Sequence, residues 1–406
     1  MNIWLVSIFE QTPIDHVFST RFICIAEEAL SRGHKITFWG STFKHNTKEQ
    51  RFESTTAVKQ HDNYKLIFVK SKAYEKNISF RRLHSHALLA KEMVKEFNQQ
   101  KEKPDILLMA FPPISLTNEV SKWTSANNIP LCLDIIDPWP DLFEKVIPSW
   151  ASILSKLIFY VPKKKVRNAF SKVDVITAIS NQYLDWSEKY HKVPQKECLY
   201  PAADFEAIRD YINKAEPINA RKYKLDIIYA GSLASSYDIP TLLKAAKILQ
   251  EEDIHFYIAG AGPQEEMIQN YIRNASNVSY LGRLSKEELM RYYAHCDLGM
   301  TQHIKGATQS VTYKLFDLLA AGLPILNSLE SEMCTIILNN RVGLHNPPGN
   351  VSVLVENIRL YLSNPIKLKE DKENGFKLAK EVGDTAVIYR RFVNLLEETS
   401  RKGNKF

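Results

Sequence analysis

Short apolar runs alternate with segments of helical periodicity along the chain, and the whole alternation occurs twice. Because the runs have little internal polarity, they are typical of parallel strands that helices cover on both faces. The candidate strands of the first half are 3–9, 34–40, 64–70, 105–111, 130–137 and 173–180. Between the first two, segment 18–33 has apolar residues at helical spacing and ends on a glycine, which predicts a helix. The first half is therefore expected to form one doubly wound α/β domain.

The same pattern begins again after a polar segment at about 200–222, which contains two prolines and is the expected linker region. The candidate strands of the second half are 225–232, 254–262, 277–284, 296–302, 323–328 and 343–348. A chain of 406 residues is too long for one compact core. We therefore expect two Rossmann-like, doubly wound parallel-sheet domains at 1–200 and 201–385, facing a central cleft, the usual ligand site of such sheets. The last helix, 386–406, is expected to return to the first domain.

Composition excludes several classes of protein. Apolar and charged residues make up 45% and 24% of the chain, as in ordinary globular proteins. The five cysteines are scattered, with no CxxC pair, which argues against a disulfide framework or a zinc site and suits the cytoplasm. The N-terminal MNIWLVSIFEQ lacks a basic region and meets Glu10 too early for a signal peptide. No uncharged run reaches the ~20 residues that span a bilayer.

The net charge of +7 is unevenly distributed. Lysines and arginines are interleaved with aromatic and aliphatic residues over about 150–172, WASILSKLIFYVPKKKVRNAFSK. This mixture suits the surface of an anionic membrane, although a solvated helix with an apolar core face has the same composition. No nucleic-acid recognition motif is present, so nucleic acid is not an expected partner.

Glycine-containing and metal-binding motifs are sparse. There is no HExxH, no EF-hand loop, no Walker loop and no Asp-x-Asp pair to hold a divalent ion against a diphosphate, so no metal or other cofactor is expected. AGS at 230–232 and GAGP at 260–263 each follow a candidate strand. Both fit either a tight turn or a loop that faces a ligand.

The stretch 308–326, TQSVTYKLFDLLAAGLPIL, passes from small polar residues into an apolar run that favours a helix. A helix that begins near Ser310 would offer free N–H groups to a phosphate. Lys314 would lie one turn in and reach the same anion, and Asp317, two turns in, would accept two ribose hydroxyls. Gln309 would hydrogen-bond a sugar hydroxyl. Spacing alone also leaves open ordinary helix capping with an exposed lysine.

The stretch resembles the signature of retaining family 4 glycosyltransferases of the GT-B fold, in which two Glu residues eight positions apart precede Ala-x-Gly-x-Pro. Here Gln309 and Asp317 precede AAGLP. DIIYAGSL, IAGAGPQEE, NVSYLGRLSKEEL, YYAHCDLGM and GLHNPPGN follow the order of the family. In the first half, MNIWLVS, SRGHKITFW, STFKHN, KPDILLMAFPP and DPWPD are similar to the subgroup that builds bacterial surface polysaccharides, including O-antigens and capsules. The resemblance covers nearly the whole chain.

The resemblance implies transfer of a sugar, with retention and without a metal ion, from a nucleotide-diphosphate sugar, expected to be a UDP-sugar. The acceptor is expected to be a lipid-linked saccharide, which would make the protein cytoplasmic and peripheral on the inner face of the membrane. The implied donor-binding positions of the second domain are Gly231, Ser232, Arg283, Gln309, Ser310, Val311, Lys314 and Asp317. Lys314 would also act in catalysis, by stabilising the leaving diphosphate.

In the first domain, which would bind the acceptor, the expected catalytic residue is Asp137 of DPWPD. Asp137 would take a proton from the acceptor or orient the acceptor. Asp134, three residues earlier, is the alternative cleft residue. Asp137 could also have a purely structural role, as an Asp that starts a proline-rich turn. His16 and Arg21 are the expected acceptor-binding residues.

Departures from the family keep two other functions open. The loop GSLASSYD lacks the Arg and Lys that grip the diphosphate in many members. Gln309 stands where the family has Glu, which leaves open a non-catalytic GT-B-like assembly protein. A UDP-sugar epimerase of the same fold is the other alternative.

Overall fold

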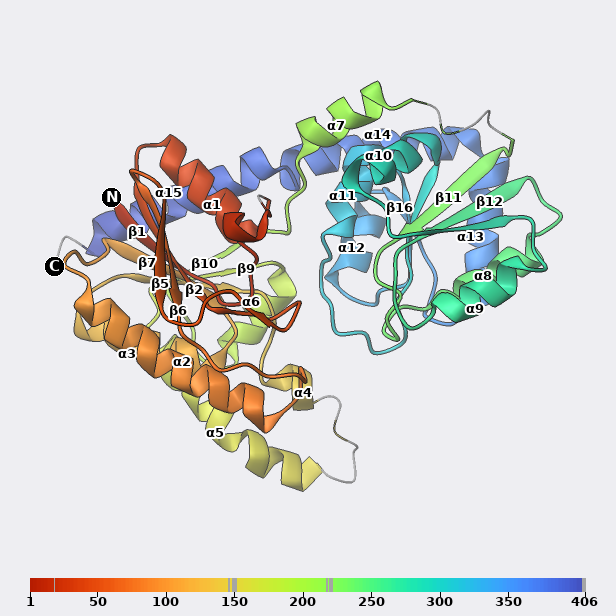
Figure 1. Cartoon of the computed structure of the whole chain (residues 1–406). Coiled ribbons are helices and arrows are strands. Elements are labelled where there is room, and N and C mark those ends of the chain that lie inside the picture. Colours follow the sequence, from red (N-terminus) through yellow and green to blue (C-terminus); the bar gives the residue numbers. More distant parts are fainter. Residues whose placement is uncertain (18, 145–146, 148–151, 217, 219–221, 404–406) are drawn as a thin grey trace. The chain divides into compact units, whose positions relative to one another are not determined.

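The structure, a computed structural model, describes residues 1–17, 19–144, 147, 152–216, 218 and 222–403 (Figure 1). Trp150 of the basic segment, residues 217 and 219–221 of the expected linker and 404–406 of the last expected helix thus lie outside the described residues. The chain divides into two compact units, Met1–Leu199 with Tyr389–Phe406, and Tyr200–Ile388. Each unit contains its own largely parallel sheet, which confirms the predicted pair of Rossmann-like α/β folds.

The first unit contains an eight-stranded sheet. Its strands are β1 (Asn2–Val6), β2 (Lys35–Ser41), β5 (Thr56–His61), β6 (Tyr64–Val69), β7 (Ile106–Phe111), β8 (Leu131–Ile135), β9 (Val175–Ala178) and β10 (Gln195–Cys198). They lie in the order β10-β9-β8-β7-β1-β2-β6-β5, with only β5 antiparallel to its neighbour among the described strands. The short strands β3 (Phe43–Lys44) and β4 (Glu49–Gln50) pair separately. The chain passes from β1 to β2 on one side of β1 and, after β6, crosses to β7 on its other side, so a crevice for a ligand is expected at the carboxyl ends of β1 and β7.

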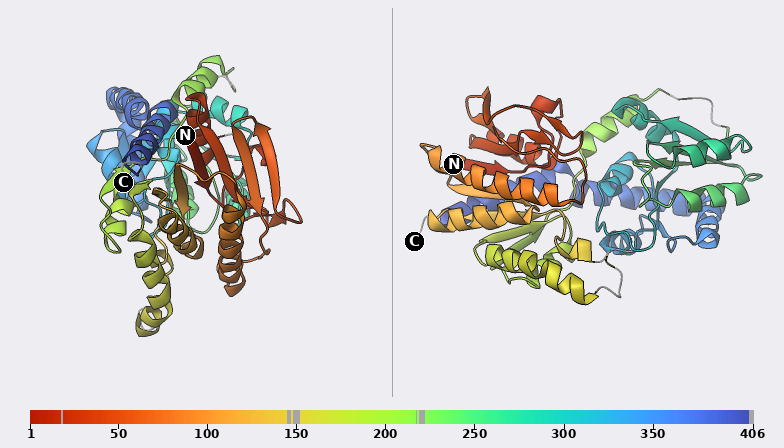
Figure 2. Two further views of the ribbon diagram at one scale, coloured as in Figure 1. Left: turned by 90° about the vertical axis from the view of Figure 1, so that its left-hand side faces the viewer. Right: turned by 60° about the horizontal axis from the view of Figure 1, so that its bottom comes forward.

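Helices cover both faces of this sheet, α1 and α15 on one and α2, α3 and α5 on the other (Figures 1 and 2). The helical elements before residue 200 are η1 (Pro13–Asp15), α1 (Arg21–Ser31), α2 (Phe80–Gln99), α3 (Ile114–Ala126), α4 (Asp141–Glu144), α5 (Ser152–Phe170) and α6 (Asn181–Glu188). The core is aromatic, because the Trp4 ring of β1 lies 5.0 Å from Trp39 of β2 and from Phe97 of α2 and stacks on Trp123 of α3 at 5.6 Å. These contacts fix β1 and β2 against the two helices.

The second unit contains a six-stranded, fully parallel sheet in the order β13-β12-β11-β14-β15-β16. Its strands are β11 (Leu225–Ala230), β12 (Ile254–Ala259), β13 (Val278–Gly282), β14 (Leu298–Thr301), β15 (Ile325–Asn327) and β16 (Gly343–His345). Its helices are α7 (Phe205–Lys214), α8 (Ile239–Ile248), α9 (Glu265–Ile272), α10 (Lys286–His295), α11 (Lys314–Ala321), α12 (Glu332–Asn339), α13 (Val351–Ser363) and α14 (Pro365–Val382). The strand order reverses between β11 and β14, which makes the carboxyl ends of these two strands the expected ligand edge.

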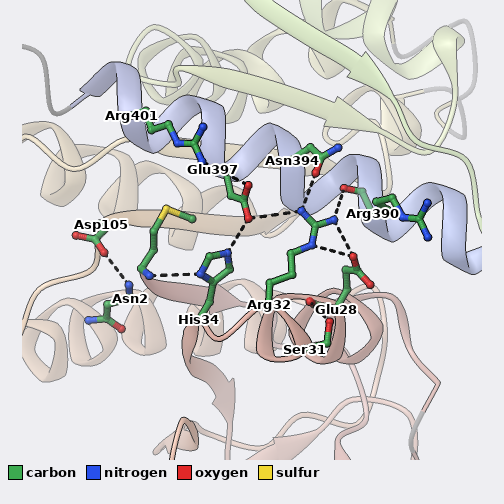
Figure 3. A network of polar contacts seen from close by, with 11 residues as sticks. Asn2, Glu28, Ser31, Arg32, His34, Asp105, Arg390, Asn394, Glu397 and Arg401 are labelled. Atoms are coloured by element: carbon green, nitrogen blue, oxygen red, sulfur yellow. Dashed lines mark hydrogen bonds and ion pairs between the residues drawn. The ribbon is translucent and has the colours of Figure 1, made fainter.

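The last helix, α15 (Thr385–Gly403), belongs to the first unit from Tyr389 onward. Figure 3 shows how polar side chains bind it to that unit. Arg32, at the end of α1, donates hydrogen bonds to the Asn394 amide oxygen at 2.6 Å and to the Arg390 carbonyl at 3.2 Å. The His34 ring lies 2.8 Å from the Glu397 carboxylate. No helix within the described part of the chain is both long enough and apolar enough to cross a membrane.

Candidate functional site

A buried ammonium marks the ligand edge of the second unit. Lys314 is the first residue of α11, and its Nζ lies 4.5 Å from the ring centroid of Tyr229 and 4.8 Å from that of Tyr237. Among the described residues Nζ has no hydrogen-bond partner. Burial lowers the pKa of the Lys314 ammonium to about 8. A buried cation without a hydrogen-bonded counter-charge is costly, so the site suits an anion supplied by a ligand.

Glycine after β11 makes room for this lysine. Gly231 has a φ of 149°, and a Cβ at that position would overlap both Nζ and Cε of Lys314. The loop after β12 packs on the same turn, because a Cβ on Gly260 would overlap the Gly231 carbonyl and one on Gly262 the backbone of Leu233. The AGS loop therefore lies against the Lys314 ammonium, whereas GAGP forms a tight turn that supports the AGS loop.

The helix of this site begins later than the sequence predicts. It was expected to start near Ser310, but α11 begins at Lys314 with Tyr313 as its N-cap. Ahead of the helix, the Ser310 carbonyl accepts hydrogen bonds from the Ser331 hydroxyl at 2.5 Å and from the Met333 amide at 3.3 Å. The next residue, Val311, is buried in the core. These contacts hold the segment before Tyr313 out of the helix. Lys314 and Asp317 consequently both lie in the first helical turn.

Two further polar groups accompany Lys314. Burial raises the pKa of the Asp317 carboxyl to about 7, although nearby Lys286 acts in the opposite direction. Within the described chain, the Gln309 amide oxygen is buried without a hydrogen-bond partner. Both groups can therefore accept hydrogen bonds from ligand hydroxyls.

His303 is a site residue that the sequence analysis missed. It lies just after β14, its ring centroid is 5.0 Å from that of Tyr237, and its Nε2 has no hydrogen-bond partner among the described residues. Burial, together with the Lys314 charge, lowers the pKa of His303 to about 4, so the imidazole is neutral at pH 7. The sequence offered one signal for this residue: His303 directly follows the predicted strand 296–302, whose carboxyl end lies at the ligand edge of the sheet.

The remaining donor candidates lie on the surface. Ser232 is exposed, and its hydroxyl accepts a hydrogen bond from the Ala234 amide at 3.3 Å. Arg283 is exposed after β13, which β12 separates from β11 in the sheet. Neither side chain is thus held in the buried group around Lys314.

In the first unit, Asp137 follows β8 at the carboxyl edge of the sheet. Burial raises the pKa of its carboxyl to about 6, and the charge of Arg82 acts in the opposite direction. The Arg82 guanidinium lies 4.7 Å from the ring centroid of Trp139, two residues after Asp137. Arg82, on α2, was missed because no local sequence pattern connects it with DPWPD.

Arg21 and Asp134 form a buried ion pair with each other. Arg21 Nε lies 2.7 Å from the Asp134 carboxylate, and neither side chain is more than 1% exposed. Arg21 also donates to the Leu199 carbonyl at 2.8 Å, and the Thr177 hydroxyl donates to Asp134 at 2.7 Å. The structure thus places Asp134 inside the sheet rather than at its edge. His16, in contrast, is exposed at the end of η1 with a φ of 59°.

The basic and apolar segment forms α5. Of its described residues, Val166, Ala169 and Phe170 are buried in the core. The exposed large apolar residues of its first half are Leu157, Ile158, Tyr160 and Val161. Lys156 and Lys164 are exposed on the same stretch. The helix therefore has a core-facing end and an apolar, basic end on the surface.

Metal ligands are not grouped in the described residues, since no three His, Cys, Asp or Glu side chains there are placed to hold one ion.

Comparison with known proteins adds to this geometry. Residues 210–378, which include Lys314 and Asp317, match the family model of glycosyl transferases group 1. None of the curated proteins compared with the chain matches it. The match and the fold support a glycosyltransferase.

Solved structures of low sequence identity share the fold over nearly the whole chain. Sucrose-phosphate synthase from Thermosynechococcus elongatus is 13% identical, with 98% of each chain covered and a TM-score of 0.71. Anabaena HepE in complex with UDP is also 13% identical, with 98% of this chain and 100% of that chain covered and a TM-score of 0.69. WaaG, a glycosyltransferase involved in lipopolysaccharide biosynthesis, is 14% identical, with 97% and 99% covered and a TM-score of 0.63. The fold is GT-B.

Proposed function

We propose that the protein is a retaining family 4 glycosyltransferase that moves a sugar from a UDP-sugar to a lipid-linked saccharide during bacterial surface polysaccharide synthesis. The observation that carries the proposal is the buried Lys314 ammonium, which lies at the switch point of the second sheet without a hydrogen-bond partner among the described residues. A donor diphosphate supplies the missing counter-charge.

Two further polar side chains of the same region complete the proposed donor site. The Asp317 carboxylate accepts hydrogen bonds from the two ribose hydroxyls, and the Gln309 amide binds a hydroxyl of the donor sugar. HepE has been solved with UDP and with UDP-glucose, which supports a uridine donor for this chain of the same fold.

The reaction breaks the bond between the anomeric carbon and the leaving phosphate oxygen and forms a bond from that carbon to an acceptor oxygen. Negative charge grows on the diphosphate as the first bond breaks, and Lys314 stabilises this charge more in the transition state than in the ground state. The acceptor hydroxyl loses its proton in one of two ways: the leaving phosphate takes it while Asp137 orients the hydroxyl, or Asp137 itself takes it. Retention follows if attack occurs on the face that the phosphate leaves. Lys314 offsets one negative charge of the diphosphate, and we propose that the reaction uses no metal ion.

The test is donor binding. Purified full-length protein is titrated with UDP-, GDP- and dTDP-sugars by calorimetry, with and without EDTA. Lys314→Met is compared with Lys305→Met, at an exposed lysine of the loop that precedes α11. We expect one UDP-sugar to bind, EDTA to have no effect, and only Lys314→Met to lose affinity. If no donor binds at millimolar concentration, the proposal fails and a non-catalytic assembly role gains support. Epimerisation of a bound UDP-sugar without acceptor would instead favour an epimerase.

We further propose that α5 places the protein on the inner face of the cytoplasmic membrane, where a lipid-linked acceptor resides. Its exposed leucine, isoleucine, tyrosine and valine suit the acyl boundary, and Lys156 and Lys164 suit anionic headgroups. The test is sedimentation with vesicles that contain anionic lipid. Leu157→Ser should reduce binding, whereas Ile366→Ser, at a residue of the second unit that is also 71% exposed, should not. Equal binding of both variants and the unaltered protein would contradict this placement.

A further inference from the structure

Exposed apolar side chains of the first unit gather at two places. Among its described residues, the large apolar side chains that are exposed form two groups. One is the stretch 157–161 of α5, and the other, the α2 patch, consists of Ile78, Phe80 and Leu83. In the second unit, by contrast, the exposed large apolar residues each lie on a different helix or loop. Single exposed apolar residues are ordinary, whereas a contiguous group marks an interaction site.

The α2 patch lies at the start of its helix and takes no part in the core. Phe80, the first residue of α2, is 91% exposed, and Ile78, just before the N-cap, is 75% exposed. Leu83 follows Phe80 by three positions, so the two side chains share one face of the helix. The core contacts of α2 come from later turns, through residues such as Leu89 and Met93. Because burial of such large apolar side chains is favourable, the α2 patch suits a partner that covers it.

The charges around the α2 patch indicate which partner this is. The sequence has no Asp or Glu from residue 76 to residue 91, and Lys76, Arg81 and Lys91 are exposed there. The α5 group has the same setting, since no acidic residue occurs from 145 to 173. Lysine is depleted in protein–protein interfaces, whereas apolar side chains among cations are complementary to an anionic lipid surface. The setting therefore favours a membrane over a second protein.

Both apolar groups are fixed to the same short segment, DPWPD at 137–141. Arg82, next to the α2 patch, places its guanidinium carbon 4.7 Å from the ring centroid of Trp139. Lys163, two residues after the α5 group, lies 3.3 Å from the Asp141 carboxylate. Helices α2 and α5 also cover the same face of the sheet (Figure 1). The two groups thus flank the segment that contains Asp137, at the carboxyl edge of the first sheet.

We infer that the α2 patch is a second membrane contact of the first unit, with Phe80 and its apolar neighbours inserted into the surface of an anionic bilayer. The inference rests on the membrane placement proposed for α5. It adds an orientation, because two separate contacts hold the carboxyl edge of the sheet toward the bilayer. A lipid-linked acceptor then reaches Asp137 from the membrane side.

The experiment measures sedimentation of the full-length protein with vesicles of phosphatidylcholine alone and of phosphatidylcholine mixed with phosphatidylglycerol. We expect tighter binding to the anionic vesicles. Phe80→Ser should weaken that binding about tenfold or more, and Arg81→Gln about fivefold. Ile366→Ser and Arg273→Gln, at exposed residues of the second unit, are the matched controls and should bind as the unaltered protein does.

Three results would overturn the inference. The first is anionic binding by Phe80→Ser that equals that of the unaltered protein; if Leu157→Ser still weakens binding in the same assay, the α5 placement stands and the α2 patch alone is excluded. The second is equal binding to neutral and anionic vesicles. The third is a lipid-free dimer, seen by analytical ultracentrifugation, that Phe80→Ser dissociates without any effect on vesicle binding, because the α2 patch would then bind a second copy of the chain.

Folding and donor binding are followed on the same samples. All six tryptophans precede residue 199, so unchanged tryptophan emission shows that the first unit of Phe80→Ser is folded. Vesicle binding that depends on Phe80, without binding of any UDP-sugar, would support the membrane contact and contradict sugar transfer. Binding of a UDP-sugar without binding to vesicles would contradict the membrane contact and leave sugar transfer standing.

Discussion

The ammonium of Lys314 occupies the space that a side chain on Gly231 would need, because a Cβ at residue 231 would overlap Nζ and Cε. The two residues come from different secondary structure elements, the turn after β11 and the first turn of α11. The absence of a side chain at one position therefore determines where the charge of the other lies.

Gly231→Ala should displace Lys314 and weaken donor binding by about tenfold or more, the equivalent of one misplaced charge-assisted hydrogen bond. It should also destabilise the second unit, since a φ of 149° is strained for alanine. The matched control is Gly306→Ala, where φ is 78° and no atom lies within 4 Å of an added Cβ. That control should lose about 1 kcal/mol of stability and keep its donor affinity. Calorimetric titration of both variants checks the prediction, and equal affinities would contradict it.

Lys314→Met should make the unliganded protein more stable while it weakens donor binding. Methionine fills similar space without a buried charge, so the free energy of unfolding should rise by about 1 kcal/mol. Donor affinity should fall by about 10- to 100-fold, because the ammonium bonds the diphosphate. Scanning calorimetry measures the first effect and donor titration the second. A less stable variant would show that the ammonium has a stabilising partner within the protein.

Donor affinity should be greatest between about pH 7 and pH 8. The Asp317 carboxyl has a pKa raised to about 7 and accepts ribose hydroxyls when ionised, so affinity should fall as the pH drops below that value. The Lys314 ammonium has a pKa lowered to about 8, so affinity should also fall as the pH rises above it. Titrations with a UDP-sugar from pH 5.5 to 9 test this profile. Asp317→Asn should remove the acidic limb and Lys314→Met the alkaline limb, and a flat profile in the unaltered protein would rule out both roles.

Arg21→Met should cost the first unit about 3–5 kcal/mol, because it leaves the fully buried Asp134 carboxylate without its ion pair. The double variant Arg21→Met with Asp134→Leu should recover much of that loss. Lys35→Met is the control, since its pair with Glu102 is exposed to solvent and contributes little to stability. Urea unfolding followed by tryptophan emission reports on the first unit alone. A loss in Arg21→Met no larger than in Lys35→Met would show that the buried pair contributes little.

The sequence predicted twelve of the thirteen parallel strands in the described sheets, because strands buried on both faces are continuous apolar runs. Strand β10 was missed because QKEC is short and polar. Strand β5 was missed because TAVKQH is largely exposed at the sheet edge. The start of α11 was misplaced because the contacts that hold Ser310 and Val311 out of the helix come from α12 and the core, not from neighbours in sequence. The contacts of Arg82 could not be predicted for the same reason, since the rings beside it, those of Phe9, Tyr74 and Trp139, are distant along the chain.

The attachment of α15 also bears on synthesis of the protein at the ribosome. Arg32 and His34 bind a part of α15 that is made after the second unit, and Phe392, Val393 and Leu396 of that helix are buried. The second unit is continuous in sequence and is complete once Ile388 has emerged. Most of the first unit emerges before the second unit, but the first unit can finish folding only after α15 has emerged, so the order of emergence and the order of completion are reversed.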